Sequence, residues 1–318
     1  MGVRYTKAIQ RNDVSPNETG SATFNLSEPV QAGMAEMVGF NMKFTAAGAS
    51  HAANEWGLVK TLTIVYNGNQ VFNYTDLAAV NTLATLPRLV ALCEDMGGFI
   101  TSSGSSTAVD SWMWLPLGIN LGANARVEVR VTFVAAAAAI SAPEFCVWHK
   151  YGASKAASIV GNATTVSLTG GSQTQAVIRV PSYPNAVVSG LQIQSTTATD
   201  DLVSAIIKPL GDFELNNDAL RAIGGRNFGA GELYDYLDGA TLVQTDGKDS
   251  GQTFVPLYGY SSADSTVVVL LTAATSENYA ITPILSVPTS RNTGEMMGTQ
   301  TQSRATSSAS SILDRAED

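Results

Sequence analysis

Two histidines, His51 and His149, are the residues of this sequence best suited to acid–base or metal chemistry. His51 lies in GASHAANE, which is typical of a loop, and His149 follows Trp148 in a predicted strand. A catalytic triad or a metal centre needs a histidine together with a nucleophile, a carboxylate or further ligands. Neither histidine has such neighbours along the chain, so a catalytic role is predicted for neither.

Acidic residues gather at places that could bind a cation or cleave a glycosidic bond. Asp200–Asp201 and TDGKDSG (245–251) offer carboxylates, but neither has EF-hand spacing, and hydrophilic turns are the simpler interpretation. A glycosidase needs two carboxylates about 5 to 10 Å apart across one cleft. The residues crowded enough to supply them are Glu214, Asp218, Glu232 and Asp235, which helix capping and solvation also explain. No cofactor is predicted, and a structural cation such as Ca²⁺ is allowed but not indicated.

Other chemical signals are missing from the sequence. It contains no GxSxG elbow, phosphate-binding glycine loop or CxxC pair. Cys93 and Cys146 lie in apolar surroundings without close spacing, and buried free thiols are predicted. The net charge of −9 argues against a nucleic-acid-binding body. No signal peptide, transmembrane helix or enzyme activity is predicted.

Two groups of residues suggest contact surfaces instead. Trp112, Trp114 and Trp148 could stack on sugars or bases, but they alternate within predicted strands, which favours packing in the core or between subunits. Three basic residues precede the first acidic residue and form a short basic segment before an acidic body: Arg4, Lys7 and Arg11. A solvated, mobile terminus is the alternative interpretation of this segment.

The strands that would carry these residues occur twice. A shift of 140 positions places Pro116 on Pro256 and Val129 on Val269 without a gap, and both stretches predict strand, turn and strand. Further blocks recur in the same order. ATFNLSEP (22–29) matches VIRVPSYP (177–184), Gly39 matches Gly190, and Asp76 matches Asp218, with offsets that fall from 155 through 151 to 142. Each Asp is predicted to start a helix after a strand pair.

The repeat predicts two β-sandwiches of six to eight strands each. The expected organisation is an N-terminal arm at 1–19, a first sandwich at 20–152, a linker at 153–171, a second sandwich at 172–288 and a flexible tail at 289–318. The linker is predicted from its small residues, and the tail from its polar, Ser/Thr-rich composition.

In its repeat order, strand pair and late Pro-Leu hairpin, residues 20–288 resemble the double jelly-roll major capsid proteins of tailless icosahedral viruses. The chain length is similar to that of compact bacteriophage members with an internal membrane. The resemblance implies two consecutive eight-stranded jelly rolls, each with a short inserted helix. It also implies a homotrimer that forms a pseudo-hexameric capsomer.

The resemblance extends to location and partners. The protein would be made in the host cytoplasm and reside in the virion, with other capsomers, penton or vertex proteins and an internal lipid membrane as partners, and with no specific nucleic-acid recognition. Arg4, Lys7 and Arg11 would then contact lipid headgroups or neighbouring capsomers. A tandem carbohydrate-binding or adhesin-like protein is the second hypothesis, and a sandwich-fold glycosidase the third.

Overall fold

The computed structural model describes most of the chain, and strands make up most of the described part. Within that part there is one α-helix, α1 (Arg88–Asp95), and one turn of 3-10 helix at Glu55–Leu58. The all-β fold class predicted from the sequence is confirmed. The described residues are 3–16, 20–47, 55–76, 88–101, 107–135, 139–153, 156–181, 186–195, 202–208, 213–216, 235–238, 241–244, 252–261 and 266–288.

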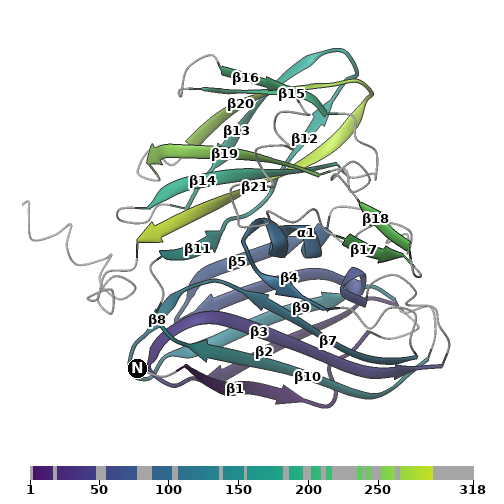
Figure 1. The fold of residues 1–318 in the computed structure, drawn as a ribbon, viewed down its shortest axis with the longest axis vertical. Helices are drawn as coiled ribbons and strands as arrows, with labels where there is room; N and C mark the ends of the chain where they lie inside the picture. Colours follow the sequence, from purple (N-terminus) through teal and green to yellow (C-terminus); the bar gives the residue numbers. More distant parts are fainter. Residues whose placement is uncertain are drawn as a thin grey trace, which may run out of the picture.

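The first half of the chain forms a sandwich of two antiparallel sheets, drawn in the lower part of Figure 1. Sheet A has the order β1-β10-β3-β7-β6, with β8 also paired to β3, and sheet B has the order β2-β9-β4-β5. The strands of sheet A are β1 (Arg4–Arg11), β3 (Gly33–Ala46), β6 (Phe99–Ile100), β7 (Ala108–Leu115), β8 (Ile119–Leu121) and β10 (Ile140–Tyr151). Those of sheet B are β2 (Ala22–Pro29), β4 (Val59–Tyr66), β5 (Asn69–Thr75) and β9 (Arg126–Phe133).

The second half forms another antiparallel sandwich, drawn in the upper part of Figure 1. Sheet C has the order β11-β21-β14-β19, with β12 also paired to β21, and sheet D has the order β13-β20-β15-β16. The strands of sheet C are β11 (Ala156–Val160), β12 (Thr164–Leu168), β14 (Val187–Ser195), β19 (Gln252–Ser261) and β21 (Glu277–Pro288). Those of sheet D are β13 (Gln173–Arg179), β15 (Leu202–Lys208), β16 (Phe213–Asn216) and β20 (Thr266–Ala273), and β17 (Asp235–Asp238) pairs with β18 (Thr241–Gln244).

The two sandwiches have the same topology. Sheet D repeats sheet B, because β13, β20, β15 and β16 take the places of β2, β9, β4 and β5. Sheet C repeats sheet A, because β21, β14 and β19 take the places of β10, β3 and β7, while β11 and β12 together replace β1 along β21. Each half thus has the eight strand positions of a jelly roll, four in each sheet, with short additional strands, and the predicted duplication is confirmed strand by strand.

Two predicted boundaries differ from the structure. Residues 4–11, predicted to belong to an N-terminal arm, form β1 and pair with β10 from Arg4–Tyr151 to Arg11–Phe145. The predicted linker at 153–171 contains β11 and β12, which both pair with β21. Without these strands the backbone N–H and C=O groups of β10 and β21 would lack partners along one side, so both segments complete a sheet.

The alignment of the repeat also needs one correction. Leu26 of β2 pairs with Val129, and Ala176 of β13 pairs with Val269, which is the counterpart of Val129. Leu26 therefore corresponds to Ala176, an offset of 150 rather than the 155 predicted from the two proline-terminated segments. The register follows the hydrogen-bonded partner strand and the buried face, and Leu26 and Ala176 are both buried.

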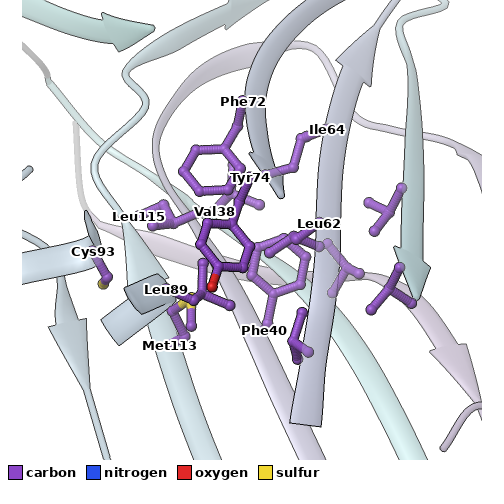
Figure 2. Packing of buried hydrophobic residues seen from close by; sticks show 14 of the residues in the cluster. Val38, Phe40, Leu62, Ile64, Phe72, Tyr74, Leu89, Cys93, Met113 and Leu115 are labelled. Atoms are coloured by element: carbon purple, nitrogen blue, oxygen red, sulfur yellow. The ribbon is translucent and has the colours of Figure 1, made fainter. Parts of the chain in front are cut away.

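Alternation of apolar and polar residues explains why these segments form strands with one buried face. In β9, RVEVRVTF, the three valines and Phe133 are buried, whereas Arg126, Glu128 and Arg130 are exposed. The period of two places the apolar side chains between the sheets. Figure 2 shows this core in the first half, where Phe40 of β3, Leu62 of β4 and Tyr74 of β5 pack together. Leu89 of α1 joins the same cluster.

Local signals are confirmed where they can be tested. Asn67-Gly68 joins β4 to β5 with φ angles of 48° and 81°, which is the left-handed geometry of a tight hairpin turn. Cys93 and Cys146 are free and buried, as predicted. The described part of α1 begins at Arg88, and residues 77–87 after Asp76 lie outside the described residues. The predicted second helix after Asp218 and the tail at 289–318 also lie outside them.

Candidate functional site

Most residues with catalytic potential on sequence grounds lie outside the part of the chain that the structure describes. His51, Asp200–Asp201 and the segment 245–251 lie outside the described residues, as do Asp218 and Glu232. Glu214 lies in β16 and Asp235 in β17, and these two strands belong to different sheets. Within the described part of the chain, no group of three or more His, Cys, Asp and Glu residues is placed to hold a metal ion. No helix of that part is long and apolar enough to span a membrane.

His149 lies in the core of the first sandwich, where its ring joins the two sheets. Tyr66 of β4 lies 2.6 Å from its Nε2, and the Tyr151 hydroxyl lies 3.5 Å from its Nδ1. Tyr151 also donates a hydrogen bond of 2.8 Å to the Gln31 carbonyl. Burial raises the pKa of Tyr66 well above its ordinary value, so its hydroxyl is protonated and donates to Nε2. The proton of the neutral ring then belongs on Nδ1, facing the Tyr151 oxygen.

This arrangement stabilises neutral histidine. Burial lowers the pKa of His149 from 6.5 to about 4. A proton added to Nε2 would face the Tyr66 hydroxyl proton, so the hydrogen bond that Nε2 accepts from Tyr66 would be lost. The charged ring would also lack the hydration that it has in water. The site therefore connects sheets A and B through His149 and Tyr66.

The three basic residues near the N-terminus are exposed on β1 but do not converge. The Arg4 guanidinium lies 4.6 Å from the Tyr151 ring centre. Lys7 lies 5.1 Å from the Trp148 ring centre and 3.9 Å from a Glu144 oxygen. Arg11 forms an ion pair with Asp13 at 2.7 Å. Since a strand rises about 3.3 Å per residue, Arg4 and Arg11 lie roughly 23 Å apart, at opposite ends of β1.

Aromatic side chains cover the outer face of sheet A, on the side away from the core. We call this set the aromatic face: Tyr5, Phe99, Trp112, Trp114 and Trp148. Trp112 stacks on Trp114 with ring centres 6.0 Å apart, Tyr5 meets the edge of Trp114 at 5.8 Å, and Trp148 lies 5.9 Å from Trp112. Tyr5 is 56% exposed and Phe99 is 67% exposed.

A glycine allows the aromatic rings to lie flat on this sheet. Gly39 of β3 lies between Trp148 of β10 and Trp114 of β7, and a Cβ atom at Gly39 would meet the Trp114 ring at 2.7 Å. The second half has the same arrangement of a ring over a glycine, because a Cβ atom at Gly190 would meet the ring of Phe254. The glycines correspond in the sequence with an offset of 151 and the rings with an offset of 140, and the strand pairing differs accordingly: Gly39 lies opposite Trp114, whereas Gly190 lies opposite Pro256.

The tryptophans were predicted to pack in the core or between subunits, and the structure places all three, partly exposed, on the outer face of sheet A. Sequence reasoning missed Tyr5 and Phe99. Tyr5 alternates with Lys7 in a segment interpreted as an arm, and Phe99 follows two glycines and belongs to none of the blocks that repeat in the sequence. The pairing of Phe99 with Trp114 brings it to the aromatic face.

The whole fold is similar to solved structures of capsid proteins. The major capsid protein P2 from bacteriophage PM2 has a TM-score of 0.51 and 12% identity, over 92% of this chain and 99% of that chain. The MCP of Sulfolobus turreted icosahedral virus has a TM-score of 0.58 and 10% identity, over 91% and 97%. The PBCV-1 virus capsid has a TM-score of 0.50 and 10% identity, over 91% and 95%. No protein-family model and no curated protein matches the sequence.

At these identities the similarity concerns the fold, and it covers nearly the whole of each chain that is compared. This protein has the double jelly-roll fold of the capsid proteins to which it is similar. The resemblance to double jelly-roll capsid proteins that the repeat predicts is confirmed for the fold.

Proposed function

We propose that this protein is the major capsid protein of an icosahedral virus and that it acts through shape and self-association rather than through catalysis. Three copies form a homotrimer, and trimers tile the shell of the virion. The virus in this proposal is a bacteriophage, and its capsid protein is made in the host cytoplasm. Vertex proteins fill the positions that trimers leave open.

The observation that carries this proposal is the strand-by-strand duplication of the jelly roll within one chain. Two equivalent sandwiches in each subunit give six in a trimer, so a threefold assembly has a nearly hexagonal outline. Such an outline packs side by side in a sheet, and closed symmetry of this kind is usual for protein oligomers. Structural similarity to capsid proteins over more than nine-tenths of the chain supports the same role.

The first test is the mass of the purified protein in solution, measured by light scattering after size exclusion. We expect a species of about 100 kDa, three times the 33.3 kDa of one chain, or closed shells in the void volume. A persistent monomer at micromolar concentration would contradict the proposal. A glycan-binding screen would then test the carbohydrate-binding hypothesis.

We also propose that the shell encloses a lipid membrane and that Arg4 faces it. Arg4 begins β1, beside the end of β10, and Figure 1 places the N-terminus on the same side of the molecule as the end of β21. Both chain segments that leave the sandwiches therefore lie on one side, which we assign to the interior. In this proposal Lys7, which lies over Trp148, contacts a neighbouring copy of the chain, and Arg11 does the same.

Arg4→Gln is expected to weaken binding of the full-length protein to vesicles with anionic headgroups by about fivefold, because one basic residue near such a surface contributes about 1 kcal/mol. Arg11→Gln is the matched control, since Arg11 lies at the opposite end of β1 and is paired with Asp13. Cosedimentation with anionic and neutral vesicles at low and high salt measures the effect. Equal binding by wild type, Arg4→Gln and Arg11→Gln would contradict the assignment.

A further inference from the structure

We infer that the aromatic face of sheet A binds the second half of another copy of this chain, in the way that sheet C binds the first half within one chain. The inference rests on the proposed function, since it names the surface through which subunits of the shell associate. It follows from comparing two equivalent sheet faces, of which one is covered within the chain and the other is exposed.

The covered face is the outer face of sheet C. Phe254 of β19 and Ile284 of β21 are buried there, and both belong to the hydrophobic cluster of the first half rather than to that of the second. The elements of the first half that contact this sheet are β5, which lies against β11, and α1, which lies against β14 and β19. Figure 1 shows α1 and β5 on the side of the first sandwich that faces the second.

Polar contacts accompany this apolar contact. Gln70 of β5 donates a hydrogen bond of 2.8 Å to Asn162, which follows β11. The backbone N–H of Ser158 in β11 donates to the Leu117 carbonyl at 3.2 Å. The outer face of sheet C is thus covered by one edge of the first jelly roll of the same chain.

The equivalent face of sheet A has no such cover within the described residues. Trp114 lies over Gly39 as Phe254 lies over Gly190, but Phe254 is 4% exposed whereas Trp114 is partly exposed. Tyr5, 56% exposed, and Phe99, 67% exposed, extend the same face. Both are among the few large hydrophobic side chains that the described part of the chain exposes. Contiguous exposed apolar surface of this kind marks protein–protein contacts.

The repeat also identifies the occupant. Since sheet A corresponds to sheet C, the element that sits on it corresponds to β5, and that element is β16 of the second half. Within one chain β16 belongs to the sheet farther from the first half, as Figure 1 shows, so it must come from another copy. The contact joins two different surfaces, so it propagates head to tail and closes when a ring is complete.

The residues of the aromatic face suit such a contact. Tyrosine and tryptophan are enriched where subunits bury surface, because they contribute a large contact area with few rotatable bonds. The stack of Trp112 on Trp114 is held in place by Gly39 beneath it and by Tyr5 at its edge. Together they form a broad aromatic surface with fixed side chains, which suits a protein partner.

Glutamate substitutions at the two most exposed residues of this face test the inference. Tyr5→Glu and Phe99→Glu place a charge where the partner would exclude water, and each is expected to weaken self-association at least about 30-fold, the effect of losing a hot-spot side chain. Both side chains are more than half exposed, so the monomer should keep its circular dichroism spectrum and melting temperature. Val177→Glu is the matched control, because Val177 is 50% exposed and lies on β13, at the opposite edge of sheet D from β16.

The outcomes separate this inference from the proposed function. A wild-type protein that stays monomeric would overturn the proposed function, and the inference with it. A wild-type trimer that persists in folded Tyr5→Glu and Phe99→Glu proteins would overturn the inference alone. Loss of the trimer in these two proteins but not in Val177→Glu is the expected result.

Cross-linking then tests the head-to-tail geometry. Isotopically labelled and unlabelled copies of the full chain are mixed, assembled and treated with a lysine-specific cross-linker. We expect links from Lys7 or Lys150, both on sheet A, to lysines in the second half of a differently labelled copy. Links between copies that join only Lys7 to Lys7 would contradict the geometry, because they require the same surface on both sides.

Discussion

Acidification from pH 7 to pH 4 is expected to lower the free energy of unfolding by about 3 kcal/mol through His149. The pKa of His149 is about 4 in the folded protein, against an ordinary value of 6.5 that the unfolded chain keeps. Between these values the unfolded chain binds the proton more readily, so the stability is fully present above about pH 6.5 and falls as the pH drops toward 4. Each unit of pKa difference corresponds to about 1.4 kcal/mol.

His149→Gln isolates this effect from the titration of the carboxylates. Glutamine stays neutral and can still donate and accept hydrogen bonds, so the variant should lose part of its stability at neutral pH but depend less on pH between 4 and 7. Urea unfolding at a series of pH values gives both slopes, with Tyr66→Phe as a second variant that removes the donor to Nε2. Parallel slopes for wild type and His149→Gln would show that His149 is not the group responsible.

Gly190→Ala is expected to lower the free energy of unfolding by about 3 kcal/mol. The added Cβ would overlap the ring of Phe254, which is 4% exposed and packed against the first half. Overpacking of a buried site typically costs about 1 to 3 kcal/mol, and this ring has little space to move into. Chemical denaturation measures the change.

Two comparisons make the Gly190 result specific. Gly122→Ala should leave stability nearly unchanged, because a Cβ at Gly122 meets nothing within 4 Å. In a Phe254→Leu background, Gly190→Ala should cost less than in the wild type, since the smaller side chain leaves room for the methyl group. Equal unfolding midpoints for Gly190→Ala and wild type would mean that the Phe254 ring does not lie over Gly190.

Sequence alone predicts the features that depend on neighbouring residues. Asn67-Gly68 can form a tight turn wherever it occurs, and the alternation in β9 requires only that one face be buried. The repeat is visible because Val129 and Val269, or Gly39 and Gly190, meet the same local demands in both halves. Two consecutive sandwiches follow from such signals.

Features that depend on distant partners are harder to predict. The segment at Arg4–Arg11 is polar and basic, and it becomes a strand only because β10, far along the chain, has an open edge. The small residues of β11 and β12 are suited to a linker until β21 pairs with them. Alternation places Trp112 and Trp114 on one face of β7. It does not decide which face is the core, because Met113 and Leu115 on the other face are apolar too.

The pairing of β11 and β12 with β21 has a consequence for the order of folding during synthesis. Residues 156–168 leave the ribosome early in the second half, but their partner at 277–288 emerges last among the described strands. Until then the second sandwich lacks a central strand of sheet C, and β14 exposes an unpaired edge. Such edges promote aggregation, and contacts of long sequence separation form slowly. Nascent second halves therefore keep this aggregation-prone edge until residues 277–288 have emerged, and only then can the second sandwich present two complete sheets.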